Sequence, residues 1–156
     1  MSINKKSKTI ARNKDGLFNY EPIETYQAGI VLTGPEVKSA KLGHMSLKGS
    51  YATIDPNGEA WLVKSHISPY KPAGNAQKNY DPDQKRKLLL NKKELSSLIG
   101  KTKQKGLTII PINVYTNRGL IKVDIALARG KTKIDKREAI KKRESKREIQ
   151  RTLKQG

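Results

Sequence analysis

The clearest strand pattern of the chain lies in residues 110–127, IPINVYTNRGLIKVDIAL. Its second half alternates, with an apolar side chain at every second position and Lys122 and Asp124 between them. Successive side chains of a strand point to opposite faces, so this pattern predicts a strand with one face in the core. Asn117-Arg118-Gly119 predicts the turn of a hairpin, and Pro111 predicts an edge position or a bulge. The predicted inward residues are Ile110, Ile112, Val114 and Thr116, then Ile121, Val123, Ile125 and Leu127.

Working outward, three shorter segments also read as strands. Residues 26–32 alternate, and residues 51–54 and 60–63 flank Asp55-Pro56-Asn57-Gly58, a strong hairpin turn signal. In the last of these strands we expect Trp61 to belong to the core, the usual place of a tryptophan in an alternating strand. The residues of 26–32 predicted to share one face are Tyr26, Ala28, Ile30 and Leu32.

Two helices are predicted between the strands. Thr33 and Glu36 have the spacing of a capping box, and Gly43 ends that short helix. Asn91 and Glu94 repeat the cap, and Gly106 ends the second helix. Its stripe toward the core is Leu95, Leu98, Ile99 and Thr102. Residues 68–83 hold three prolines and one glycine and read as a long loop.

Short strands with a helix before the last pair predict a mainly β fold with peripheral helices. We expect an antiparallel OB-fold-like barrel plus a flexible basic C-terminal tail, with a split sandwich as the alternative. The predicted division is a basic N-terminal arm over 1–14, an OB-like RNA-binding barrel over 15–129 and a basic tail over 130–156. The tail has too little apolar surface to dock, so it should be disordered alone and helical when bound to a polyanion.

The charge of the chain points to a polyanionic partner. There are 33 Lys and Arg against 14 Asp and Glu, a net charge of +19. Residues 1–14 carry +5, residues 15–128 carry +6 and residues 129–156 carry +8. Nucleic acid is favoured over an anionic membrane surface, because a membrane-binding helix needs large apolar residues along one face. The tail offers only Ile134, Ile140, Ile149 and Leu153.

Composition and motifs speak against catalysis. The chain has no cysteine, and its two histidines, His44 and His66, have no helical metal-ligand spacing. Both Gly-Lys-Thr tripeptides lack the earlier glycine of a phosphate-binding loop. We therefore expect no enzyme, no cofactor and no metal. The first ten residues carry three lysines and no apolar stretch follows them, so no secretory signal is expected. The lack of cysteine fits a reducing cytoplasm, and we expect a cytoplasmic location.

Aromatic residues are 5% of the chain, so recognition of a structured RNA by backbone and shape is expected rather than reading of single strands. The segment Lys85-Arg86-Lys87-Leu88-Leu89-Leu90-Asn91 places three basic residues before a leucine run. It can be a phosphate clamp or a solvated strand start with a core anchor. The residues alone leave both interpretations open, with Asn91 favoured as a helix cap.

Several of these motifs together resemble the SsrA-binding protein family, also called small protein B. The resemblance extends from about Ile10 to Glu144. It rests, in order along the chain, on Ile10-Ala11-Arg12-Asn13-Lys14, Ala28-Gly29-Ile30-Val31-Leu32-Thr33-Gly34, Glu36-Val37-Lys38-Ser39, Arg86-Lys87-Leu88-Leu89-Leu90-Asn91 and Asp135-Lys136-Arg137.

The resemblance implies a bacterial, cytoplasmic, non-enzymatic RNA-binding protein with an OB-type barrel. Members bind the tRNA-like domain of transfer-messenger RNA and deliver it to stalled ribosomes for trans-translation. The implied partners are that RNA and the ribosome, where the tail becomes a helix in the empty mRNA channel of the small subunit beyond the decoding centre. A monomer and no membrane are expected. The alternative is a basic ribosomal or assembly protein that binds ribosomal RNA directly, and an RNA-processing nuclease comes third.

The resemblance also implies site residues. Those for transfer-messenger RNA are Asn13, Lys14, Gln27, Glu36, Lys38, Ser39, Lys41, Arg86, Lys87, Leu89 and Asn91. Those of the ribosome-binding tail are Gly130, Lys131, Lys133, Asp135, Lys136, Arg137, Lys141, Lys142 and Arg143. This sequence departs from the family pattern twice: Gln27 stands where members often have Glu, and Ile134 where they often have Tyr or His.

Overall fold

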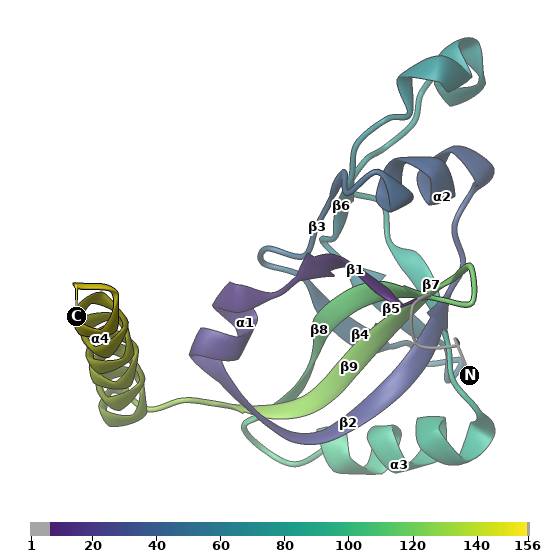
Figure 1. Ribbon diagram of the computed structural model, residues 1–156. Coiled ribbons are helices and arrows are strands. Elements are labelled where there is room, and N and C mark those ends of the chain that lie inside the picture. The colour runs from purple at the N-terminus through teal and green to yellow at the C-terminus, as the bar shows by residue number, and fades with distance from the viewer. Residues whose placement is uncertain (1–6, 156) are drawn as a thin grey trace.

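The computed structural model describes residues 7–155, which Figure 1 shows as labelled helices and strands. The strands are β1 (Lys8–Arg12), β2 (Tyr20–Ile30), β3 (Met45–Ser46), β4 (Tyr51–Ile54), β5 (Ala60–Val63), β6 (His66–Ile67), β7 (Arg86–Leu89), β8 (Leu107–Asn117) and β9 (Leu120–Gly130). The helices are α1 (Lys14–Asn19), α2 (Gly34–Lys41), the 3-10 helix η2 (Lys71–Gln77), α3 (Lys92–Thr102) and α4 (Lys133–Gln155). The part of the predicted N-terminal arm over residues 1–6 lies outside the described residues, as does Gly156.

Seven strands form one antiparallel sheet in the order β1-β8-β4-β5-β7-β2-β9. An additional β8–β9 pairing closes six of these strands into a ring, visible in Figure 1 around the centre of the molecule. Strands β3 and β6 form a separate two-stranded sheet. The prediction of a mainly antiparallel β fold with peripheral helices is therefore confirmed, and the ring excludes the sandwich alternative.

Inward residues of β9 and β2 form part of the core inside the ring. Val123, Ile125 and Leu127 are at most 2% exposed, and Ala28 on β2 is fully buried. Each large apolar side chain buried in this way contributes about 1.5–3 kcal/mol to folding. The predicted inward face of the last strand is confirmed.

Strand β8 differs from its prediction because it contains a bulge. Its register with β9 shifts between Pro111 and Asn113, and it pairs on both sides, so the proline marks a bulge and not an edge. One extra residue reverses the alternation of a strand. Val114 accordingly packs in the main core, whereas Ile110 and Ile112 pack in a small second cluster. The predicted common face of these three residues was wrong.

Strand β5 points Ala60 and Leu62 into the core and Trp61 to the outside. Its neighbours Ala60 and Leu62 are 3% and 0% exposed and belong to the main core. Trp61 is half-buried on the outer face, so its predicted core position was wrong. Alternation places a residue between two core positions on the outside of the sheet.

The two predicted helix caps are both present. Thr33 and Glu36 form a reciprocal capping box at α2, and Asn91 and Glu94 form another at α3. Leu98 of α3 is fully buried and closes one end of the ring. Three elements were not predicted: β1, the first half of β2, and η2 inside the expected loop.

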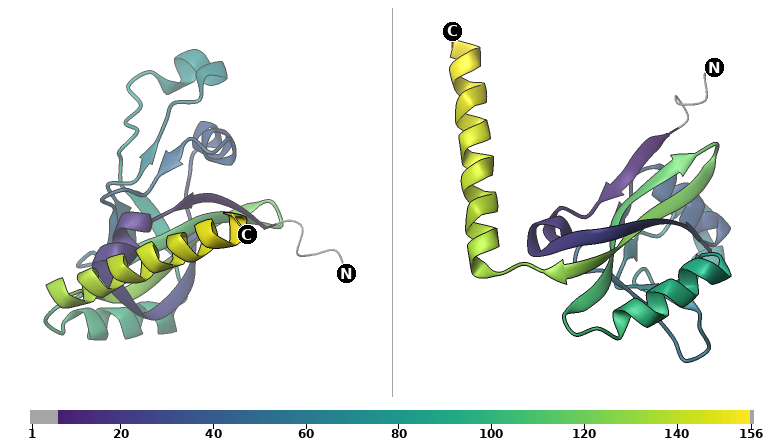
Figure 2. Two further views of the ribbon diagram at one scale, coloured as in Figure 1. Left: turned by 60° about the vertical axis from the view of Figure 1, so that its left-hand side comes forward. Right: turned by 90° about the horizontal axis from the view of Figure 1, so that it is seen from below.

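Helix α4 stands apart from the ring, as the right-hand view of Figure 2 shows most clearly. Its residues are mostly exposed, including Ile134, Ile149 and Leu153 at 61% or more. One contact to the body is the Arg143 guanidinium 5.3 Å from the Phe18 ring centroid. The predicted disorder of the free tail stays a prediction. Within residues 7–155 no helix is long and apolar enough to cross a membrane.

Candidate nucleic-acid interface

The turn from β7 into α3 exposes the residues that the sequence singles out most sharply. Leu89 is 52% exposed although the residue before it, Leu88, lies in the core at 2%. Asn91 is exposed and caps α3, its Oδ1 accepting from the Glu94 N–H at 2.8 Å. This cap uses the side-chain oxygen, which leaves the Nδ2 group to donate to a second molecule. The turn thus offers an apolar contact and a fixed amide side by side.

A hollow of about 330 Å³ lies beside Leu89. Its wall includes Gly29 of β2, and a Cβ there would come within 3.3 Å of the Leu89 Cβ. The lack of a side chain at Gly29 therefore lets Leu89 lie close to the neighbouring strand. Leu120, 62% exposed in the β8–β9 turn, and Lys122 complete the rim. The hollow combines exposed apolar carbon with a cation, which suits a nucleotide.

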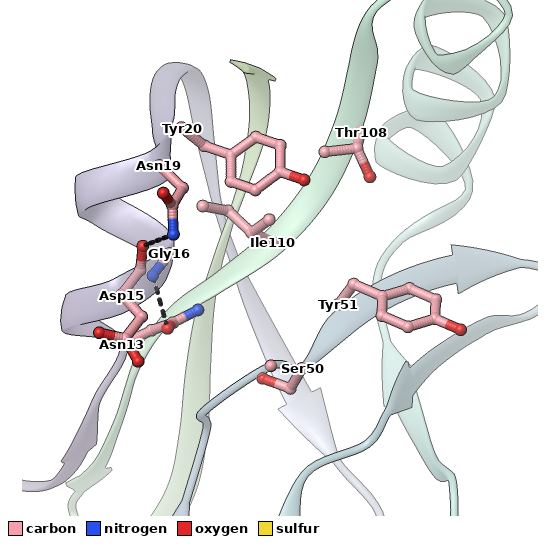
Figure 3. A pocket seen from close by; sticks show the side chains of 10 residues that line it. Asn13, Asp15, Gly16, Asn19, Tyr20, Ser50, Tyr51, Thr108 and Ile110 are labelled. Atoms are coloured by element: carbon pink, nitrogen blue, oxygen red, sulfur yellow. Dashed lines mark hydrogen bonds between the residues drawn. The ribbon is translucent and has the colours of Figure 1, made fainter. Parts of the chain in front are cut away.

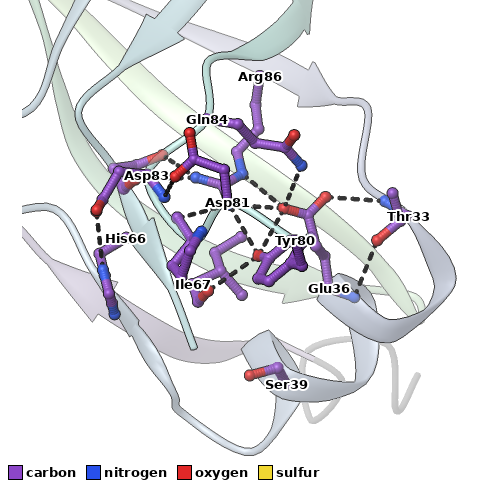
Figure 4. A network of polar contacts seen from close by, with 12 residues as sticks. Thr33, Glu36, Ser39, His66, Ile67, Tyr80, Asp81, Asp83, Gln84 and Arg86 are labelled. Atoms are coloured by element: carbon purple, nitrogen blue, oxygen red, sulfur yellow. Dashed lines mark hydrogen bonds and ion pairs between the residues drawn. The ribbon is translucent and has the colours of Figure 1, made fainter. Parts of the chain in front are cut away.

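Behind this edge lies a buried polar network, drawn in Figure 4. The Arg86 guanidinium donates to Glu36 Oε2 from Nη2 at 2.6 Å and from Nε at 2.9 Å. Both side chains are at most 2% exposed. Arg86 also donates to Ser65 O and to Pro82 O, each at 2.9 Å, and to Tyr80 Oη at 3.0 Å. The guanidinium thus ties α2 to β7 and to the segments around both.

The two ionisable partners of this arginine have shifted pKa values. Burial raises the pKa of Glu36, but hydrogen bonds from the Thr33 N–H and the Arg86 guanidinium lower it by more than burial raises it. The pKa of Glu36 is therefore below its ordinary value. Burial and the Glu36 carboxylate raise the pKa of Tyr80 to about 12. Glu36 is therefore ionised and Tyr80 protonated at neutral pH. The pair is a stable ionic cross-link.

The position of Arg86 and Glu36 corrects their predicted role as RNA contacts. A phosphate cannot reach a guanidinium that is 2% exposed and already bonded to a carboxylate, two carbonyls and two hydroxyls. The Glu36 carboxylate forms its ion pair with this arginine. Of the two interpretations left open for the basic segment, the structural one describes Arg86, while its neighbours Lys85 and Lys87 stay on the surface.

Two more of the predicted contacts are buried. Asn13 is 3% exposed, and it accepts from the Gly16 N–H and donates to Pro111 O at 2.8 Å. Figure 3 shows it in the wall of a 240 Å³ hollow beside α1. Ser39 is fully buried and donates to Ser68 O at 2.6 Å. The hydrogen bonds of both side chains go to the backbone, which they hold in place.

The remaining predicted residues of the body lie on the surface. Lys14, Lys38 and Lys41 are exposed at the first helix and along α2. Lys87 is 40% exposed and lies 3.6 Å from Glu59. Gln27 is exposed and its Nε2 donates to Tyr115 Oη on the outer side of the ring.

The tail begins with its own helix cap. Asp135 accepts from the Thr132 hydroxyl at 2.8 Å, and Thr132 Oγ1 accepts from the Asp135 N–H at 3.2 Å. The Thr132 hydroxyl and the Thr132 N–H both donate to the Asp135 carboxylate, and these two bonds lower its pKa. Lys131 is held to the body by its N–H to Asn19 O at 2.9 Å. The other predicted tail residues are Gly130, Lys133, Lys136, Arg137, Lys141, Lys142 and Arg143, which are exposed except for the half-buried Lys136.

With this geometry established, comparisons with known proteins identify the family. A family model described as SmpB protein matches residues 10–155. The chain belongs to the SmpB family. An SsrA-binding protein of Sulfurihydrogenibium sp. is 53% identical over 94% of this chain and 95% of its own. One from Trichodesmium erythraeum is 52% identical over 95% of this chain and 94% of its own.

A solved structure of an SmpB protein has the same fold. It is described as "tmRNA-SmpB: a journey to the center of the bacterial ribosome", and its chain is 46% identical. The TM-score is 0.64, with 83% of this chain and 92% of that chain covered. The family assignment made from the motifs is therefore confirmed.

The two departures from the SmpB pattern lie in different settings. Gln27 takes part in a chain across three strands, in which Tyr115 Oη donates to Asp124 Oδ1 at 2.9 Å. A glutamate there would face Asp124 across the ladder, so the amide suits this position. Ile134 is 67% exposed near the start of α4 and can offer contact area but no ring.

Sequence reasoning missed the partners that make the site rigid. Tyr80 and Gln84 donate to Glu36, and Ser65 accepts from Arg86. These residues come from segments without periodicity, and Glu36 and Arg86 are 50 positions apart, so no local pattern links them. In the described part of the chain no group of three or more metal-ligating residues comes together.

Proposed function

We propose that this chain binds the tRNA-like domain of transfer-messenger RNA and carries it to stalled ribosomes for trans-translation. The observation that carries the proposal is near-full-length identity of about half to proteins named for binding SsrA, the transfer-messenger RNA. The similarity to a chain described with that RNA on the bacterial ribosome supports the same partners. Ribosomal-RNA binding as the primary role is not favoured, because none of these names carries it.

In this proposal the body contacts RNA through its exposed residues, and the buried ones position them. Leu89 and Asn91 supply apolar contact and a hydrogen-bond donor. Surface lysines neutralise phosphates, each releasing a counterion. These lysines are Lys14, Lys38, Lys41 and Lys87, and Gln27 adds a polar contact. The Glu36–Arg86 pair, with Asn13 and Ser39, keeps α1, α2 and β7 in register beneath that surface.

The tail is proposed to serve the ribosome. Helix α4 has basic side chains around most of its circumference and little apolar surface to bury against the body. Such a helix can lie along ribosomal RNA phosphates in the empty mRNA channel of the small subunit beyond the decoding centre. The protein acts in this proposal as a monomer in the cytoplasm, as a binding partner without catalysis or cofactor.

A gel-shift panel tests the proposal. The full chain should bind transfer-messenger RNA more tightly than tRNA or ribosomal RNA fragments at one fixed salt concentration. Leu89→Ala should weaken that complex about tenfold, because a central apolar contact is lost. Leu42→Ala removes an exposed leucine just after α2 and should change affinity little. Equal affinity for all three RNAs would contradict the proposal and favour a ribosomal-RNA-binding protein.

A further inference from the structure

The outer face of β4, β5 and β7 carries a tryptophan that the proposed function does not use. Trp61 lies opposite Thr53 of β4 and Lys87 of β7 in the sheet ladder, so all three point outward from the ring. Thr53 is exposed, and both Trp61 and Lys87 are half-exposed. The face is therefore open to solvent over its centre.

The ring of Trp61 is held in one orientation. Its Nε1 donates to Asp55 Oδ2 at 2.9 Å. Asp55 in turn accepts from the Asn57 and Glu59 N–H groups, each at 2.9 Å, through its other oxygen. The tight β4–β5 turn thus fixes the carboxylate, and the carboxylate fixes the indole. A ring held in this way loses little entropy when a ligand stacks on it.

A cation covers the exposed side of this ring. The Lys85 ammonium lies 4.3 Å from the Trp61 ring centroid. The next row of the same face repeats the arrangement, with the Lys64 ammonium 5.9 Å from the Tyr51 ring. Lys64 has a φ of 64°, a conformation that non-glycine residues rarely adopt. Two aromatic rings on one sheet face are thus each paired with a flexible, exposed lysine.

We propose that Trp61 is a stacking platform for an unpaired RNA base. Stacking of a base on the indole face contributes more free energy than the contact of an exposed ammonium with the ring. The displaced Lys85 is then free to pair with the phosphate of the same nucleotide. Lys87 offers a second cation beside the ring. A protein partner is less well suited, because exposed lysines lie beside both rings of this face.

This platform deepens the proposed function. Leu89 lies two residues after Lys87 on β7 and so shares the outer face, which makes the platform continuous with the Leu89–Asn91 edge. The identity of the RNA in the cell rests on the proposed function. The ability of the ring to stack on a base does not, and it can be measured separately.

The chain contains one tryptophan, so its emission reports on this ring alone. Titration of the full chain with a short, unstructured oligouridylate should quench the emission in a saturable way. Inorganic polyphosphate, which has charge but no bases, should bind without that quenching. Unchanged emission at saturating oligouridylate would overturn the proposal, as would equal quenching by polyphosphate.

Substitution gives the second test, with affinity read from the anisotropy of labelled oligouridylate. Trp61→Leu should weaken binding about tenfold, whereas Trp61→Phe keeps a ring and should lose less. Thermal melts show whether each variant is folded. If Trp61→Leu fails to fold, Trp61→Phe and the emission titration still decide. Binding by Trp61→Leu equal to that of the parent chain would overturn the proposal.

Transfer-messenger RNA separates this inference from the proposed function. Addition of the RNA to the full chain should both shift the gel and quench the emission. A shift with unchanged emission at saturation would contradict an RNA-bound platform and leave the proposed function standing. No shift would contradict the proposed function, and the oligouridylate titration would still decide whether Trp61 stacks on a base.

Discussion

Arg86 in the body and the arginines of α4 are the same residue type in opposite environments. Arg86 is 2% exposed and bonded to a carboxylate, two carbonyls and two hydroxyls. Arg137, Arg147 and Arg151 are exposed along a helix that stands away from the ring. Arginine can be a cross-link or a ligand for phosphate, and burial decides which.

The difference teaches how one chain can serve two RNA surfaces. A buried charge must be paired to be tolerated, so the Arg86 guanidinium is paired inside the folded protein and cannot bind a phosphate. Apart from Arg143, which lies over the Phe18 ring, the arginines of α4 are exposed and available to a polyanion. Charge counts alone cannot make this distinction, because Arg86 and Arg137 contribute equally to +19.

The largest expected effect follows from removing the tail. A chain ending at Arg129 should melt at nearly the same temperature as the full chain, because α4 buries little surface on the body. In a reconstituted translation assay this truncated chain should support no peptide tagging on stalled ribosomes. Full tagging by this truncated chain would show that the tail is not a ribosome ligand.

The next effect is on the stability of the body. Arg86→Ala should lower the free energy of unfolding by about 3–5 kcal/mol, because Glu36 is left buried without its counter-ion. Chemical denaturation measures the loss. Lys87→Ala, in the adjacent position with an exposed ion pair, should cost at most about 1 kcal/mol. Equal losses in the two variants would mean that the Glu36–Arg86 pair is not a structural cross-link.

A pH dependence should arise from the same pair. The pKa of Glu36 is lowered in the folded state, so its contribution to stability is present above the unfolded pKa of about 4.3 and is lost as pH falls through the folded value. Glu36→Gln should flatten the acid limb of a stability curve. Glu24→Gln removes a carboxylate whose pKa the exposed Lys101 lowers, and it should flatten that limb less. The reverse order would contradict the buried cross-link.

The smallest effect concerns Asn91, which serves both folding and binding. Asn91→Ala removes the cap of α3 and should cost about 1 kcal/mol of stability. Asn91→Asp keeps a capping oxygen but loses the amide donor, so it should leave stability nearly unchanged while weakening RNA binding. A melt and a gel shift on both variants separate the roles. Unchanged RNA affinity in Asn91→Asp would remove Asn91 from the interface.

Local patterns predicted the parts of the fold that are encoded locally. The alternation of β9 and the caps at Thr33 and Asn91 needed only neighbours in sequence. The bulge at Pro111 was foreseen, but its reversal of the β8 face was not, because that depends on pairing with β9. Trp61 was misplaced because a short alternating strand does not reveal which face turns inward.

Exposed Leu89 and Asn91 lie together at one turn, and their role as RNA contacts stays a prediction. The buried state of Arg86 depends on Glu36 and Tyr80, which come from distant segments, so spacing along the chain could not reveal it. Tertiary contacts decide whether a basic residue is a ligand or a cross-link.

The most direct test of the division between body and tail is the affinity of the chain ending at Arg129 for the isolated tRNA-like domain. If the two regions bind independently, this affinity should match that of the full chain within about twofold, as for independent sites. Loss of the binary complex in the truncated chain would contradict the account.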